Sequence, residues 1–274
     1  MNKHVAWQVS GSAPETYQRA LVPAIFAPWA SQVVDLANPA QGDRVLDVAC
    51  GTGVVARAAA IRVGAAGVVT GIDLNGGMLA VAKSVPVSDK PPSAPIRWQE
   101  ANAGKLPFPS GIFEIVYCQL GLQFFPDRPA ALREMHRVLV AGGRLALMVW
   151  SGIQESPGFA TLAVLLQRHI GPEAASFMQA PFSLSDPEGL AALTHSAGFR
   201  DIVVQSKVGT IRFPTIEHFV ADYVAATPLA GYVCAAGKEA REHLLSEAQS
   251  ALRQFIKNGE LVFPIAARFL NARA

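Results

Sequence analysis

The chain has 274 residues, of which 51% are hydrophobic and 16% charged, and its formal net charge is +2. This is enough apolar material for a large core and too much for a disordered chain. Because Lys and Arg form no basic stripe, the sequence argues against nucleic acid as a partner.

Three cysteines, Cys50, Cys118 and Cys234, lie far apart and form no Cys-x-x-Cys pair. This argues against a disulfide framework and a zinc site, and it favours a reducing compartment. The first 15 residues lack the apolar segment of a secretory signal, and no apolar run approaches the roughly 20 residues of a membrane-spanning helix. We therefore expect a cytoplasmic protein with no metal site and no integral membrane segment.

The first 38 residues predict an N-terminal helical arm that acts as a lid. Within it, Ser12 to Asn38 reads as helical pieces that Pro23 and Pro28 punctuate. Residues 39–150 then alternate strand-like and helix-like segments, as expected of a nucleotide-binding core. We expect strands at residues 44–49, 67–73, 96–101, 113–118 and 143–150, and helices at 54–63, 77–84 and 129–139.

Residues 151–274 predict a C-terminal part that completes the sheet and covers it. We expect helices at residues 158–170 and 187–196, a strand at 201–208, helical structure over 215–259 and a last strand at 262–271. The strands are apolar throughout, which is typical of a parallel sheet buried on both faces. The prediction is an α/β, Rossmann-like, doubly wound and mostly parallel seven-stranded sheet, with a helical cap inserted between the last two strands.

The segment from Asp47 to Gly53 lies where the first strand gives way to a helix. Glycines there allow a sharp turn and close approach to a ligand, and the helix behind them presents free N–H groups. Asp73 ends the next strand, 20 residues after Gly53. In nucleotide-binding βαβ units, an acidic residue at this place binds ribose hydroxyls.

The glycines alone do not identify the ligand, because Gly51-x-Gly53-x-x-Ala56 also matches the dinucleotide fingerprint. An NAD(P)-dependent oxidoreductase is therefore one alternative. Asp47 favours S-adenosylmethionine (SAM), because its carboxylate would repel a pyrophosphate and attract the ammonium group of the methionine part. A protein that binds SAM without catalysis is the second alternative.

VLDVACGTGVVA (residues 45–56) and GIDLNGGML (residues 71–79) resemble the first two motifs of class I SAM-dependent methyltransferases. The similarity is closest to the type 11 branch, which includes the methyltransferases of ubiquinone and menaquinone biosynthesis. Residues 100–127 resemble the third and fourth motifs. The resemblance is strong over residues 40–150 and weaker over 1–39 and 185–208. It implies an enzyme that transfers the methyl group of SAM to a small molecule.

The resemblance also implies roles for single residues. Asp73 would bind the ribose, Leu74 and Met78 would line the adenine pocket, and Asn102 with Ala103 would meet the adenine edge. The family usually has Asp where this chain has Asn102, whose carbonyl can accept the same bond, and it often has Gly at the position of Ala49. The expected cofactor-binding residues are Tyr17, Asp47, Ala49, Gly51, Thr52, Gly53, Asp73, Leu74, Met78, Asn102, Ala103, Gln119 and Leu120.

The aromatic and aliphatic residues of the arm and of the C-terminal helices indicate a fairly apolar acceptor pocket. The candidates for acceptor contact are Tyr17, Phe26, Gln123 and Phe124. The sequence names no catalytic base, although His169 and His218 lie in cap segments that could face the pocket. The expected function is in-line methyl transfer to a small, apolar metabolite. Whether O, N or C is methylated stays open, as does the oligomeric state, a homodimer included.

Overall fold

The computed structural model describes residues 10–87 and 92–274. Its sheet has the strand order β3-β2-β1-β4-β5-β8-β6, and the two-residue strand β7 pairs with β8. Strands β1 to β5 run parallel to one another, and β8 is antiparallel to both β5 and β6. The strands are β1 Arg44–Val48, β2 Val68–Asp73, β3 Ile96–Glu100, β4 Phe113–Gln119, β5 Leu139–Trp150, β6 Arg200–Phe213, β7 Ile256–Lys257 and β8 Glu260–Arg273. The predicted doubly wound, mostly parallel sheet is confirmed.

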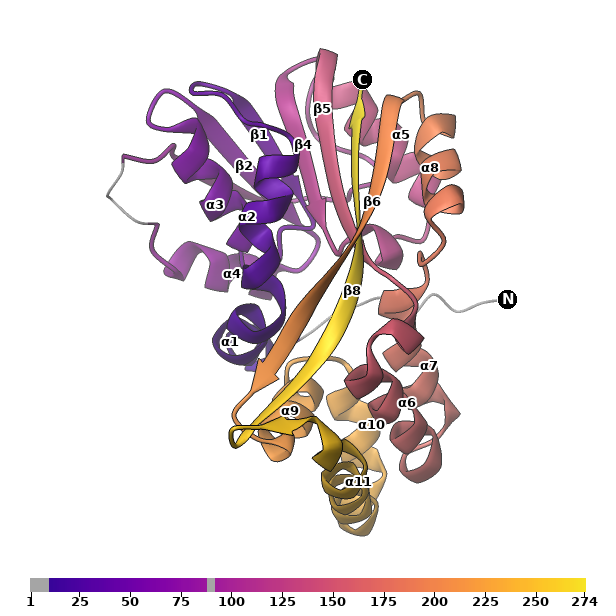
Figure 1. Cartoon of the computed structure of the whole chain (residues 1–274). Coiled ribbons are helices and arrows are strands. Elements are labelled where there is room, and N and C mark those ends of the chain that lie inside the picture. Colours follow the sequence, from indigo (N-terminus) through magenta and orange to yellow (C-terminus); the bar gives the residue numbers. More distant parts are fainter. Residues whose placement is uncertain (1–9, 88–91) are drawn as a thin grey trace.

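Helices cover both faces of this sheet (Figure 1). Alternate strand residues point to opposite faces, so Val45 and Ile115 join the core on the α2 and α3 side, whereas Leu46 and Val116 join the core on the α5 and α8 side. The helices are α1 Ala13–Thr16, α2 Ala27–Leu36, α3 Val54–Val63, α4 Gly76–Ser84, α5 Arg128–Val138, α6 Pro157–His169, α7 Pro172–Gln179, α8 Pro187–Ser196, α9 Ile216–Ala225, α10 Leu229–Ala235 and α11 Gly237–Leu252. None of the helices in the described ranges is long and apolar enough to cross a membrane.

The arm is more continuous than its two prolines predict. Between α1 and α2 lies a π-helix, η1, over Tyr17–Phe26, and Pro23 lies inside it. Pro28 falls in the first turn of α2, where the missing N–H has no helical partner to lose. The arm is therefore helical through both prolines, with Pro23 inside the π-helix and Pro28 in the first turn of α2.

The C-terminal part also differs from the sequence expectation. Strand β6 extends to Phe213, five residues beyond the predicted end, because its outer half pairs with β8 from Val208↔Ala266 to Phe213↔Leu261. The predicted helical stretch 215–259 contains three α-helices, which break at Pro228 and at Gly237 with its φ of +87°. Its last residues are not α-helical, because the 3-10 turn η5 (Arg253–Phe255) and the strand β7 follow α11. Helix α7 was not predicted. In Figure 1 the β6–β8 ribbon runs past the other strands and ends among the cap helices α9 to α11.

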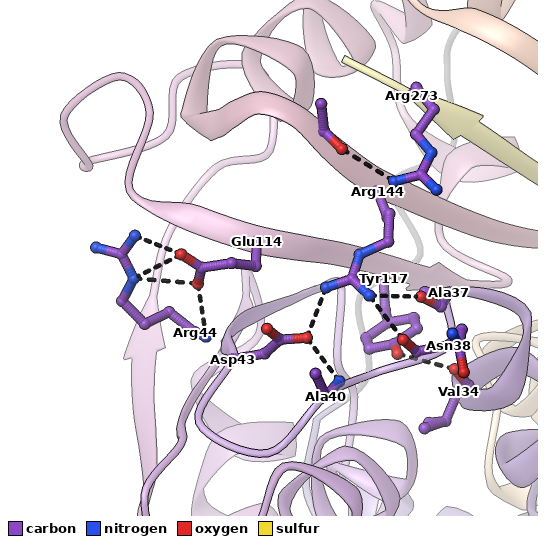
Figure 2. A network of polar contacts seen from close by, with 11 residues as sticks. Val34, Ala37, Asn38, Ala40, Asp43, Arg44, Glu114, Tyr117, Arg144 and Arg273 are labelled. Carbon is purple, nitrogen blue, oxygen red and sulfur yellow. Dashed lines mark hydrogen bonds and ion pairs between the residues drawn. The ribbon is translucent and has the colours of Figure 1, made fainter.

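A polar network fastens the C-terminal end of α2 to the sheet (Figure 2). The Arg144 guanidinium donates to the carbonyls of Ala37 and Asn38 at 3.1 and 2.6 Å, and to the Asp43 carboxylate at 2.6 Å. The Tyr117 hydroxyl donates to the Val34 carbonyl at 2.9 Å. The last carbonyls of a helix have no helical partner, and they attract a cation. Arg144 therefore holds the end of the arm in a fixed place.

This network predicts that Arg144→Met lowers the free energy of unfolding by about 2–3 kcal/mol, because carbonyls and a partly buried carboxylate lose their donor. Urea unfolding measures the change. Arg62→Met is the matched control, since Arg62 pairs with Asp35 at an exposed position, and it should cost less than about 1 kcal/mol. Equal losses in the two variants would contradict the role of Arg144.

Candidate active site

The loop between β1 and α3 carries three residues with left-handed backbone, Ala49, Gly51 and Gly53, at φ of +55°, +53° and +87°. Glycine adopts this conformation freely, and a residue with a Cβ is strained by roughly 1–2 kcal/mol. Ala49 is therefore strained, as its place in a glycine position of the resembling family suggests. Its methyl group fills the space over Gly121, where an added Cβ would lie 2.6 Å from the Ala49 Cβ.

Asp47 lies behind this loop and does not line the cavity. Its side chain is 1% exposed, and its Oδ2 accepts a hydrogen bond at 2.9 Å from the N–H of Ala56 in the first turns of α3. Burial raises the pKa of Asp47 to about 8, although the Ala56 N–H opposes that shift. Asp47 joins β1 to α3, so the structure gives it a different place from the expected direct contact with a ligand ammonium group.

Thr52 and Gly53 are also absent from the lining of the cavity. Thr52 is 1% exposed, and its hydroxyl has no hydrogen-bond partner among the described residues. Gly53 leaves room for the Trp98 indole, because a Cβ at Gly53 would lie 2.3 Å from Cη2 of that ring. These two residues shape the loop from behind.

A cavity of about 540 Å³ opens at the carboxyl ends of the parallel strands, beneath the arm and the cap. This is the edge where ligands bind in open α/β sheets, and the volume is that of a small-molecule site. The remaining expected residues all line it. They are Tyr17, Phe26, Ala49, Gly51, Asp73, Leu74, Met78, Asn102, Ala103, Gln119, Leu120, Gln123 and Phe124.

Asp73 connects the end of β2 to the glycine loop. Its Oδ2 accepts from the N–H of Gly51 and its Oδ1 accepts from the N–H of Asn75, both at 2.8 Å. Burial raises the pKa of Asp73, and these two N–H groups oppose that shift. The N–H of Leu74 also bonds this carboxylate, which leaves it one further lone pair for a ligand hydroxyl. Beside it, Leu74 is 55% exposed and presents an apolar face at the cavity wall.

Asn102 and Gln119 are fixed by hydrogen bonds to the backbone. The Asn102 Oδ1 accepts from the N–H of Gly104 at 2.8 Å, which forms a tight turn after β3 and leaves one lone pair on that oxygen. The Gln119 Nε2 donates to the Phe26 carbonyl at 3.0 Å. Gln119 thus ties β4 to the arm as well as lining the cavity.

The half of the cavity beneath the arm and the cap is aromatic. Leu21 and Ile25 of the arm and Pro181 add aliphatic surface. Gln123 is 4% exposed, and both polar atoms of its side chain are sealed from solvent without a partner among the described residues. The aromatic residues of this half are Tyr17, Phe26, Phe124, Phe125, Trp150, Phe159, Phe182 and Tyr223.

The sequence analysis missed Trp150, Phe159, Phe182 and Tyr223 as lining residues. They come from the end of β5, from α6, from the short helix η4 (Ala180–Phe182) and from α9. In the sequence each is one apolar residue of an ordinary helix or strand. Only the tertiary packing of the cap brings them to one cavity, so no local pattern could have identified them.

Neither candidate histidine of the cap lines the cavity. His169 Nε2 lies 2.6 Å from a Glu247 carboxylate oxygen and so joins α6 to α11. His218 Nδ1 lies 3.1 Å from the hydroxyl of Thr215, which caps α9. No histidine of the described residues lines the cavity. The site therefore offers shape, aromatic surface and hydroxyl groups to an acceptor, without an imidazole base.

Comparisons with known proteins agree with this geometry. Residues 20–211 match the ubiE/COQ5 methyltransferase family. The chain is 32% identical to a demethylmenaquinone methyltransferase of Staphylococcus epidermidis, over 67% of this chain and 78% of that protein. It is 34% identical to a 2-phytyl-1,4-naphtoquinone methyltransferase of Thermosynechococcus vestitus, over 64% of this chain and 80% of that protein.

Solved structures share the fold. The YcgJ protein of Bacillus subtilis superposes with a TM-score of 0.59 at 21% identity, over 89% of this chain and 97% of that one. A phosphoethanolamine N-methyltransferase of Haemonchus contortus, in complex with SAM, has a TM-score of 0.58 at 20% identity, over 95% of this chain and 56% of that one.

The fold, the glycine loop and Asp73 at the next strand end define a Rossmann-like methyltransferase that uses SAM. The chain belongs to the ubiE/COQ5 methyltransferase family. It is an enzyme that transfers a methyl group to a small, fairly apolar molecule. The two alternatives, an NAD(P)-dependent oxidoreductase and a protein that binds SAM without catalysis, are therefore excluded.

Asp73→Ala should weaken SAM binding by at least about tenfold, because hydrogen bonds to a charged acceptor contribute about 1.5–3 kcal/mol. Titration calorimetry measures the dissociation constant. Glu100→Ala removes a carboxylate at the end of β3 that does not line the cavity, and it should leave the constant unchanged. An unchanged constant in Asp73→Ala would rule out a ligand contact at this carboxylate.

Asp47→Asn should become more stable than the wild type as the pH rises. The pKa of Asp47 is about 8 in the folded protein, against about 3.9 in an unfolded chain, so the stability it contributes is complete below pH ~4 and is lost as the pH rises toward 8. Asn keeps an oxygen for the Ala56 N–H and does not ionise.

Urea unfolding between pH 4.5 and 8 gives the free energy of unfolding of Asp47→Asn and of the wild type. The difference between these two free energies should grow by at most about 1.4 kcal/mol per pH unit. The exposed Glu239→Gln should show a constant difference. A constant difference in Asp47→Asn as well would mean that burial does not hold this carboxyl protonated.

Proposed function

We propose that the acceptor is a quinol-type aromatic ring and that the enzyme methylates a ring carbon. The observation that carries this proposal is the set of eight aromatic side chains that line the cavity, beside which the charged lining residues are Asp73, Lys105 and Asp127. Flat apolar rings stack favourably on such walls. The names of the relatives support a quinone-type acceptor, and a relative in Xylella fastidiosa is named a C-methyltransferase.

We propose that the cofactor lies across the strand ends. Asp73 accepts hydrogen bonds from the ribose hydroxyls, Leu74 and Met78 enclose the adenine, and Asn102 with Ala103 meets the adenine edge. The backbone of the glycine loop supports the methionine part, and Tyr17 covers the cofactor from the arm. The left-handed residues of the loop, the Asp73 carboxylate and the apolar Leu74 side chain fit this ligand. When bound, SAM supplies an electrophilic methyl group on sulfur.

With SAM bound, its methyl group would pass from sulfur to the ring carbon, and the electron pair of the broken bond would go to sulfur. The methylated ring would then give up its proton to water after it leaves the site. A deprotonated ring hydroxyl makes the neighbouring carbon nucleophilic, so no protein base is required. Burial and Asp73 raise the pKa of Tyr17 well above its usual range, so its phenol stays neutral and donates hydrogen bonds. The protein orients the two reactants and excludes water.

We also propose that three parts of the chain have different functions. Residues 1–38 act as a lid, residues 39–150 bind the cofactor, and residues 151–274 supply the cap and the last two strands. The arm and the cap both contribute to the lining of the aromatic half, which supports this division. From cysteine usage and charge in the sequence, we further propose a cytoplasmic enzyme that acts on a small molecule and not on nucleic acid.

The assay uses the purified chain, methyl-labelled SAM and a naphthoquinol with a short apolar side chain under reducing conditions. We expect S-adenosylhomocysteine and a product in which mass spectrometry and NMR place the methyl group on a ring carbon. A product methylated on oxygen would show that the enzyme methylates the phenol oxygen and not a ring carbon. If this naphthoquinol and ring-substituted analogues all gave no product, the quinol-type acceptor would be wrong.

The pH dependence gives a separate prediction. Since no lining histidine acts as a base, kcat/KM should rise with pH until the acceptor hydroxyl is ionised. Acceptors with electron-withdrawing substituents have hydroxyls that ionise at lower pH. For these acceptors kcat/KM should reach its plateau at a lower pH, and the decrease should equal the decrease in the pKa of the hydroxyl. A plateau at one fixed pH for all acceptors would instead indicate a titrating group of the protein.

A further inference from the structure

Tyr223 brings a hydroxyl group from the cap to the aromatic half of the cavity. It lies on α9, near the end that faces the arm, and it is 6% exposed. Its ring packs against Phe159 with centroids 5.2 Å apart and against Phe219 at 6.1 Å. These contacts fix the plane of the ring, so the direction of its hydroxyl is also fixed.

The Tyr223 hydroxyl has no hydrogen-bond partner among the described residues, and it is not one of the polar atoms sealed inside the protein. It therefore opens to the cavity that Tyr223 lines. Three other polar groups that line the cavity are already hydrogen-bonded or sealed. Gln119 donates to Phe26, the Thr227 hydroxyl donates to the Tyr223 carbonyl at 2.8 Å, and the Gln123 amide is sealed.

Tyr17 carries the other phenol that lines the cavity, and it lies near enough to Tyr223 that Tyr223 contributes to the raised pKa of Tyr17. The Tyr17 oxygen lies 4.0 Å from the position of a Cβ built on Gly51, next to the glycine loop. Tyr17 thus lies next to the glycine loop, whereas Tyr223 comes from the cap helix α9. Burial raises the pKa of Tyr223 well above its usual range, so at neutral pH the phenol is a donor.

We propose that the Tyr223 hydroxyl donates a hydrogen bond to an oxygen on the acceptor ring, and that it selects oxygen-bearing rings over hydrocarbon rings of the same shape. The inference rests on the proposed function, because it needs the acceptor in the aromatic half. A buried donor without a partner is unfavourable, so a ligand that leaves it unpaired binds poorly. Sites with such a group discriminate more sharply than apolar pockets do.

The test compares Tyr223→Phe with Tyr232→Phe. Tyr232 is a half-buried tyrosine of α10 that packs near Phe177 and does not line the cavity. In the methylation assay, Tyr223→Phe should raise KM for the quinol at least about fivefold, the loss of one hydrogen bond, while KM for SAM is unchanged. Tyr232→Phe should match the wild type in both.

A binding measurement gives a readout that does not depend on turnover. Protein saturated with S-adenosylhomocysteine is titrated with 1-naphthol and with naphthalene. The wild type and Tyr232→Phe should bind 1-naphthol more tightly, and Tyr223→Phe should lose at least about fivefold of that preference. An equal preference in wild type and Tyr223→Phe overturns the proposal, as does a wild type that prefers naphthalene.

The two proposals fail separately. If the wild type methylates no quinol but shows the Tyr223-dependent preference for 1-naphthol, the quinol-type acceptor is wrong and the hydroxyl contact stands. If the wild type methylates the quinol and Tyr223→Phe equals Tyr232→Phe in both measurements, the hydroxyl contact is wrong and the proposed function stands.

Discussion

The antiparallel pairing of β6 with β8 is the constraint on which the position of the cap depends. The pairing continues from the sheet outwards to Phe213 and Leu261, and the three helices α9 to α11 connect the two outer ends. The first residues of β6 and the last residues of β8 are hydrogen-bonded within the main sheet. The outer part of the ribbon therefore cannot tilt without breaking hydrogen bonds in that sheet. The outer end of the ribbon lies beside α9 (Figure 1), the helix that carries Tyr223, and so fixes the position of that helix.

The wall of the cavity that the arm forms is held in place by contacts at the C-terminal end of the arm. Arg144 and Tyr117 hold the end of α2 on the sheet, and Gln119 holds the Phe26 carbonyl at the end of the π-helix. Within the described part of the arm, the residues that line the cavity all come from the segment Tyr17–Phe26. A π-helix is rare and is frequent at functional sites, and here the wider turn places Tyr17 and Phe26 against each other, with ring centroids 4.9 Å apart.

The cofactor side of the site could be predicted from the sequence because its residues follow strand ends. Asp73 and Asn102 lie one strand apart at one edge of the sheet, so the alternation of strands and helices already brings them together. Asp47 shows the limit of this reasoning, because a position in the loop does not tell which way a side chain points. Its carboxylate turns back to the Ala56 N–H, a contact that depends on how α3 packs on β1.

The acceptor side could not be predicted, for a physical reason that also bears on specificity. Phe159 and Tyr223 are 64 positions apart in the numbering, and they meet because α6 and α9 both pack on the β6–β8 ribbon, which no local pattern encodes. Their contribution to the pocket is apolar contact, and an apolar pocket separates similar ligands only weakly. Selectivity must then come from the polar groups that remain open to the cavity. The phenols of Tyr17, beside the glycine loop, and of Tyr223, on α9, are groups of this kind, whereas the Gln119 amide nitrogen and the Thr227 hydroxyl are already hydrogen-bonded.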